Sequence, residues 1–144
     1  MRDIPDEKAW HSEEWGLDEP YAFKSFYGKS LNEAEKLFEG NALNRLEELN
    51  AMPKEVLCYY IAALLNYMLS DRAKGDADCV NGFLSLLENR GRDFQQLDKW
   101  TVQSLKQILY KIRENPEWFG RDESIDIDWM DRADHSLVVL RAMG

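Results

Sequence analysis

The sequence predicts an all-α protein: a compact single-domain bundle of about five helices, preceded by an aromatic-rich N-terminal arm. Apolar residues recur at helical spacing from residue 30 onward, and the period-2 alternation of strands is missing apart from the short SIDID at 124–128. A chain of 144 residues without a repeat of 20–50 residues suits one packed core rather than a solenoid. We therefore expect residues 1–144 to form a single helical domain, with the bundle in residues 30–144.

Residues 1–29 form the expected arm. Its aromatic side chains alternate with prolines and glycines that interrupt any long helix, so an irregular segment that wraps the bundle is predicted. Trp and Tyr dominate interface hot spots, and any exposed part of the arm would be the partner-binding surface. The candidate binding residues are Trp10, Trp15, Tyr21 and Phe26.

The stretch FYGKS at 26–30 marks the beginning of the first bundle helix. Ser30 and Glu33 have the spacing of a capping box. GKS also ends the phosphate-binding loop G-x-x-x-x-G-K-[ST], but the first glycine of that motif would fall on Phe23, and no apolar strand precedes it. A helix start is therefore favoured over a nucleotide site.

The helical pattern from residue 30 continues to residue 50, with a stop or kink at Gly40. One interrupted helix is favoured here over two short ones in line. The next segment, VLCYYIAALLNYML at 56–69, is apolar around nearly its whole circumference, which indicates the central helix of the bundle. Pro53 suits its first turn, and Gly75 is a candidate C-cap.

Three further elements complete the bundle. Asp76 is a plausible N-cap for a helix that ends near the NRGR at 89–92, and a second helix is expected over residues 97–114 before Asn115-Pro116. A last helix is expected over residues 128–141. Its inward-facing residues by spacing are Met130, Ala133, Leu137 and Leu140.

The formal net charge of -9 bears on the choice of partner. Residues 1–30, 31–120 and 121–144 each carry a surplus of three acidic side chains, so the field is spread along the whole chain. Such a field repels phosphate backbones and anionic lipid, which argues against nucleic-acid and membrane partners and permits a basic protein partner. Ordinary solubility explains acidity equally well.

Two features predict a cytoplasmic protein. The N-terminus has no basic segment followed by an apolar one, and no apolar run reaches 18 residues. Cys58 and Cys79 lie in apolar helical patterns without a CxxC or a nearby His pair, so we expect reduced, structural cysteines.

Signatures of catalysis are missing. The sequence has no G-x-S-x-G, no H-E-x-x-H and no Gly-rich dinucleotide turn, and His11 and His135 are its only histidines. We therefore expect no catalytic residue and no cofactor. The HSEEW at 11–15 resembles the carboxylates beside aromatics of sugar-processing sites, but adjacent glutamates point to different sides, and Ser12 capping a short helix is favoured.

The C-terminal segment offers the best metal candidate. Asp131 and His135 are four apart on a helix, and Asp128 lies one turn earlier, a pattern that could hold a divalent ion. The favoured interpretation is that these acids cap the helix and form its solvated side, so no metal site is predicted.

A basic stripe is a further candidate binding feature. Lys99, Lys106 and Arg113 recur every seven residues, so they share one face of the helix over 97–114. The stripe could bind an anionic ligand or dock a carboxylate-rich neighbour, although solvated charges on an exposed face are the commoner outcome.

The segments FYGKSLNEAEKLFEGNALNRLEEL and YYIAALLNYML resemble small uncharacterised bacterial all-helical proteins, some of them immunity-like. The resemblance covers about the middle half of the chain. It implies a helical bacterial protein and supplies no catalytic residue.

The leading hypothesis is a non-enzymatic binding protein, an immunity- or antitoxin-like inhibitor of a basic protein partner. One alternative is a metal-dependent or small-ligand-binding protein that uses the acidic segment around His135. Another is a self-associating structural protein in which the aromatic arm docks on a second copy. The sequence does not fix the oligomeric state.

Overall fold

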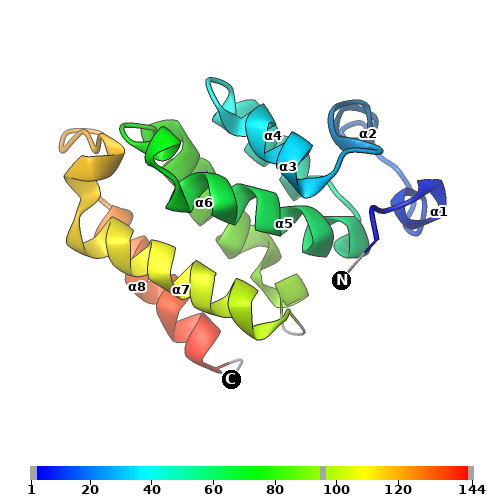
Figure 1. Cartoon of the computed structure of the whole chain (residues 1–144). Helices are drawn as coiled ribbons and strands as arrows, with labels where there is room; N and C mark the ends of the chain where they lie inside the picture. The colour runs from blue at the N-terminus through cyan, green and yellow to red at the C-terminus, as the bar shows by residue number, and fades with distance from the viewer. Residues whose placement is uncertain (1–2, 95–96, 143–144) are drawn as a thin grey trace.

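The computed structural model describes residues 3–94 and 97–142, and within these ranges it contains helices and no strand (Figure 1). The all-α prediction is confirmed. The expected number of about five helices is too low, because the described residues hold eight α-helices and four short 3-10 turns. The α-helices are α1 (Glu7–Trp10), α2 (Glu19–Phe26), α3 (Leu31–Glu35), α4 (Ala42–Asn50), α5 (Lys54–Leu69), α6 (Ala77–Arg90), α7 (Lys99–Glu114) and α8 (Trp129–Ala142).

Two of the additional helices lie in the arm that was expected to be irregular. Asp6 begins α1 by accepting a hydrogen bond from the Ala9 N–H at 2.9 Å. Pro20 stands in the first turn of α2, where its fixed φ suits a helix and its missing N–H is not needed. The arm is therefore two short helices joined by a loop.

The segment 30–50 forms two α-helices, so the prediction of one interrupted helix is wrong. The 3-10 turn Lys36–Phe38 follows α3, and α4 begins at Ala42. Gly40 between them has a φ of 75°, a left-handed conformation that a helix cannot contain and that glycine adopts without steric cost. The glycine therefore ends one helix rather than bending it.

Two of the predicted side-chain caps, at Ser30 and at Asp76, are confirmed. Ser30 and Glu33 exchange two hydrogen bonds, of 2.9 and 3.2 Å, in a complete capping box. Asp76 caps α6 by accepting the Cys79 N–H at 3.2 Å. Gly75 is left-handed as expected, but it follows the 3-10 turn Asp71–Ala73 rather than ending α5 directly.

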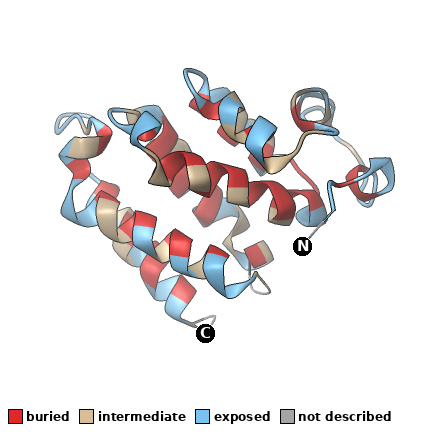
Figure 2. Cartoon of the chain, in the orientation of Figure 1, coloured by how far each residue is buried: buried red, intermediate tan, exposed pale blue. Residues whose placement is uncertain are grey.

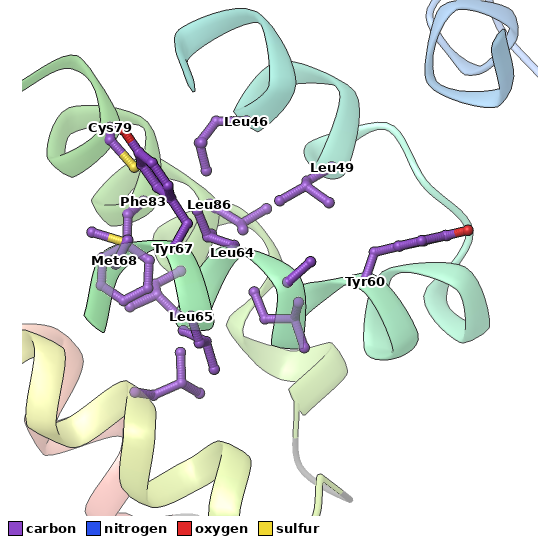
Figure 3. Close-up of a cluster of buried hydrophobic side chains, with 14 of the residues drawn as sticks. Leu46, Leu49, Tyr60, Leu64, Leu65, Tyr67, Met68, Cys79, Phe83 and Leu86 are labelled. Atoms are coloured by element: carbon purple, nitrogen blue, oxygen red, sulfur yellow. The ribbon is translucent and has the colours of Figure 1, made fainter. Parts of the chain in front are cut away.

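Helix α5 is the centre of the molecule, as its apolar circumference predicted. Ten of its residues are buried, and α1, α3, α4 and α7 all contact it (Figure 2). Figure 3 shows its side chains Leu64, Leu65 and Met68 among residues of α4 and α6. No helix of the described residues is both long and apolar enough to cross a membrane.

Helix α8 buries Ala133, Leu137 and Leu140, whereas Met130 is 44% exposed, so its predicted inward position is wrong. Trp129 is fully buried instead and donates from Nε1 to the Asn81 Oδ1 of α6 at 2.9 Å. This indole rotates the first turn of α8 so that Met130 points outward. The SIDID segment forms turns rather than a strand.

An ion pair fixes α8 against α6. Arg132 donates from Nε and Nη2 to the two carboxylate oxygens of Glu88, at 2.9 and 2.8 Å. The hydrogen bond from Arg132 is the main reason that the pKa of Glu88 lies below its ordinary value. A carboxylate with a lowered pKa stabilises the folded state above its unfolded pKa and loses that contribution as the pH falls through the folded pKa.

We therefore expect Glu88→Gln to lower the free energy of unfolding by about 0.5–1 kcal/mol near pH 7, and to have a smaller effect as the pH falls below the ordinary pKa of a glutamate. Urea unfolding of both proteins near pH 7 and below that pKa measures this difference. Glu123→Gln, at an exposed position with no hydrogen-bond or ion-pair partner among the described residues, is the control. A penalty that is independent of pH would contradict the ionic origin of the contact.

Helices α4 and α6 pack so closely that the contact requires a glycine. A Cβ built on Gly82 would lie 2.8 Å from both the Cβ and the Cγ of Leu46, shorter than van der Waals contact allows. Leu46 is itself buried, so it has little room to move aside.

We expect Gly82→Ala to destabilise the protein by about 1–3 kcal/mol, because the two helices must separate. The matched control is Gly91→Ala. Gly91 has a φ of -53° and no atom within 4 Å of a built Cβ, so alanine there should be neutral or raise stability by about 0.4–1 kcal/mol. Equal effects of the two substitutions in urea unfolding would disprove the close-packing argument.

Candidate functional site

Two adjoining hollows, of about 910 and 540 Å³, lie between the N-terminal arm, the beginning of α5 and the end of α6. They share Glu13, Lys54 and Asp93 as lining residues, so they form one continuous surface feature, which we call the acidic groove. In Figure 1 the α1 end of the arm lies beside the first turn of α5.

Carboxylates dominate the described lining of the acidic groove. Seven acidic side chains face two basic ones, Lys54 and Arg90, and one of those two is already paired, because Arg90 Nε lies 2.6 Å from Asp93 Oδ2. The net character of the groove is therefore strongly anionic. The acidic residues are Asp3, Asp6, Glu13, Asp18, Glu19, Glu55 and Asp93.

The groove holds its shape through hydrogen bonds between chain segments. Glu13 Oε2 accepts the Lys54 N–H at 2.9 Å, which ties the arm to the beginning of α5. Arg90 Nη1 donates to the carbonyls of Asn50 and Met52, both at 2.8 Å, which ties the end of α6 to the α4–α5 connection. The walls are thus held by hydrogen bonds between side chains and the backbone of segments far apart in the sequence.

Three carboxylates of the groove take no part in the hydrogen bonds that hold its walls. The side-chain carboxylates of Asp3, Asp18 and Glu55 make no hydrogen bond or ion pair with any other residue that the structure describes. All three are exposed. They are available to a cation that enters the groove.

The floor of the groove combines polar and apolar groups. Tyr59 is nearly buried there, and its burial, with the charge of Asp3 as a second cause, raises the pKa of its phenol. The Cys58 thiol donates to the Asp93 carbonyl at 3.3 Å, and neither cysteine forms a disulfide among the described residues. Ile4 and Leu97 add apolar surface.

Aromatic packing holds the arm beneath the groove. The Trp10 indole meets Phe23 edge-on at a centroid separation of 5.4 Å and lies 6.4 Å from Tyr60 of α5. The Trp15 Nε1 donates to the Trp10 carbonyl at 2.7 Å. The arm is thus part of the core, as its aromatic content suggested.

Burial corrects two of the four aromatic binding candidates. Trp10 and Phe26 are fully buried, so a partner could reach them only if the fold opened. Trp15 is half-buried, whereas Tyr21 is 67% exposed on α2. Large aromatic residues in the arm were needed to cover α5, which leaves Tyr21 as the accessible candidate.

The basic stripe is partly engaged within the fold. Arg113 Nε lies 2.7 Å from Asp134 Oδ1 of α8, an ion pair exposed on both sides. Lys99 is exposed and Lys106 is half-buried on the same helix, α7. The carboxylate that meets Arg113 therefore belongs to the chain itself, and a ligand for the stripe stays a hypothesis.

Neither the metal candidate nor the HSEEW segment forms a cluster of side chains that could bind a metal ion, within the described residues. Among residues 3–94 and 97–142, no three or more His, Cys, Asp or Glu side chains lie close enough to hold a metal ion, so Asp128, Asp131 and His135 form no such group. His11 stacks on Trp15 at 4.0 Å. Ser12 follows α1 rather than capping a helix, so that prediction is wrong.

Sequence reasoning missed most of the groove. It had singled out Glu13 for a different reason, and the other six carboxylates stand at unremarkable positions along the chain. The one signal in the sequence was that seven of the first 30 residues are acidic. These residues have no helical or strand periodicity, so their spacing does not predict that they share one surface.

Comparisons of the chain with protein-family models, with curated proteins and with solved structures found no match.

The hydroxyl of Tyr60 connects the arm to α5. Tyr60 Oη lies 2.8 Å from both the Phe26 and the Lys29 carbonyl oxygens, at and just after the end of α2, so its single proton is shared between two acceptors. Burial raises the pKa of Tyr60, so the hydroxyl keeps its proton at physiological pH.

We expect Tyr60→Phe to lower the free energy of unfolding by about 1–2 kcal/mol, because the Lys29 carbonyl loses its hydrogen bond while the ring is retained. The matched control is Tyr59→Phe, whose hydroxyl makes no hydrogen bond within the part of the chain that the structure describes. Chemical unfolding of the two variants compares them, and equal losses would show that the Tyr60 hydroxyl does not anchor the arm.

Proposed function

We propose that the protein is a non-enzymatic binding protein, of the immunity or antitoxin type, which holds a basic segment of a partner protein in the acidic groove. The observation that carries the proposal is the lining of the groove by seven carboxylates, three of which have no hydrogen-bond or ion-pair partner among the described residues. Lysine or arginine side chains are the chemical complement of such a surface.

The dimensions and chemistry of the groove favour a peptide segment over a simple ion. It extends over two hollows of about 910 and 540 Å³, larger than a single metal ion or ammonium group needs. Apolar surface from Ile4, Tyr59 and Leu97 lies among the carboxylates, and long basic side chains pack their methylene stems on such surface.

The charge of the whole chain supports rapid association with a basic partner. A net charge of -9 attracts a cationic protein from a distance, and the concave groove concentrates the field where the two surfaces meet. Exposed Tyr21 of α2 is available at the arm, beside the second hollow that Asp18 and Glu19 line.

A peptide titration with two charge-matched variants tests the proposal. The probe is a short peptide of alternating lysine and leucine, with a glutamate–leucine peptide as the negative control. Asp3→Asn/Glu55→Gln removes two groove carboxylates, and Glu114→Gln/Glu123→Gln removes two exposed ones outside it. Each double variant therefore loses two negative charges.

We expect the groove variant to weaken binding of the lysine peptide about three- to tenfold beyond the control variant, at moderate salt. Equal weakening by both variants would show that the peptide senses only the overall charge, which would sink the groove as the site. A pull-down from lysate at low and moderate salt, with the same two variants, then identifies the natural partner.

A further inference from the structure

A smaller pocket lies between the end of α6, the 3-10 turn Gly91–Phe94 and α8. Its volume is about 280 Å³, equivalent to roughly nine water molecules. Its charge is opposite to that of the acidic groove, and we call it the cationic pocket. The turn that supplies Asp93 to the groove supplies Arg92 to this pocket.

The inner wall of the cationic pocket is apolar. Leu87 of α6 and Leu140 of α8 are buried residues of the core that reach its surface, and Val139 is partly exposed beside them. These three side chains can cover a short hydrocarbon body. A pocket that combines such a wall with a few polar groups is typical of small-molecule sites.

The one acidic lining residue is already neutralised. Glu88 meets Arg132 through two hydrogen bonds, and the same guanidinium reaches the Ser85 hydroxyl at 3.1 Å. The other ionisable lining residues are Arg92 and His135. Arg92 forms no hydrogen bond or ion pair with any residue of the described ranges 3–94 and 97–142. The chain has a net charge of -9, but the guanidinium of Arg92 has no carboxylate partner among the described residues and gives the edge of this pocket a positive charge.

Ser136 provides a second, independent observation. This residue of α8 is only 6% exposed and lines the pocket, yet its hydroxyl makes no hydrogen bond to another described residue. The hydroxyl is open to the pocket, so it can donate a hydrogen bond to a molecule that enters there. An oxygen atom of a bound ligand would accept its hydrogen bond.

We propose that the cationic pocket binds a small organic anion: a carboxylate on a short hydrocarbon body. The carboxylate meets Arg92, His135 and the Ser136 hydroxyl, and the hydrocarbon lies on Leu87, Val139 and Leu140. This site is independent of the acidic groove, which selects the opposite charge.

Calorimetric titration with hexanoate tests the proposal, with hexanol as a probe of equal length that lacks the charge. We expect saturable binding of hexanoate and none of hexanol. Arg92→Gln should weaken hexanoate binding about tenfold, because it removes a charged hydrogen bond to the carboxylate. Arg113→Gln removes an exposed arginine outside the pocket and should leave the affinity unchanged. Absence of hexanoate binding, equal binding of hexanol, or equal weakening by the two arginine variants would overturn the proposal.

A second pair of variants tests the location of the hydrocarbon body. Val139 lines the pocket, whereas its neighbour Val138 is exposed and does not. We expect Val139→Phe to fill the pocket and abolish hexanoate binding, while Val138→Phe leaves it intact. Thermal unfolding of both confirms that they fold. Binding that survives Val139→Phe would contradict the proposed position.

Discussion

The burial of α5 is the constraint on which the rest of the structure depends. Its sequence is apolar on every side, so water must be excluded from its whole circumference, and a single neighbouring layer cannot do this. Helices α1, α3, α4 and α7 contact it (Figure 1), and Trp10 and Phe26 of the arm pack on its residue Tyr60. Both of these rings are fully buried.

The packing of the arm on α5 determines which of its side chains a partner can reach. The Trp10 and Phe26 rings point inward, while carboxylates of the arm such as Asp3 and Glu13 line the groove together with Glu55 and Asp93 from the body of the protein. The acidic groove is thus a by-product of the way the arm packs. The same packing explains why recognition in the proposed function depends on charge rather than on a cluster of exposed aromatic residues.

The turn Gly91–Phe94 separates two concave surfaces of opposite charge. Arg92 faces one side and Asp93 the other, and Asp93 is held by Arg90. Adjacent residues in a 3-10 turn point in different directions, so one short element can serve both surfaces. Phe94 of the same turn is buried and fixes its position against the core.

Local sequence determined much of this protein. The all-α class, the central position of α5, the capping box at Ser30, the Asp76 cap and the left-handed Gly75 all follow from patterns within a few residues, because periodicity and capping are local physical effects. The tertiary structure alone decided which face of each element is covered. It placed Trp129 inward in place of Met130, it brought Gly82 against Leu46, and it gathered Glu13, Glu55 and Asp93 at one groove. The residues that meet in each of these contacts lie at least about 35 positions apart in the sequence. Side chains so far apart meet only through the packing of the elements that carry them.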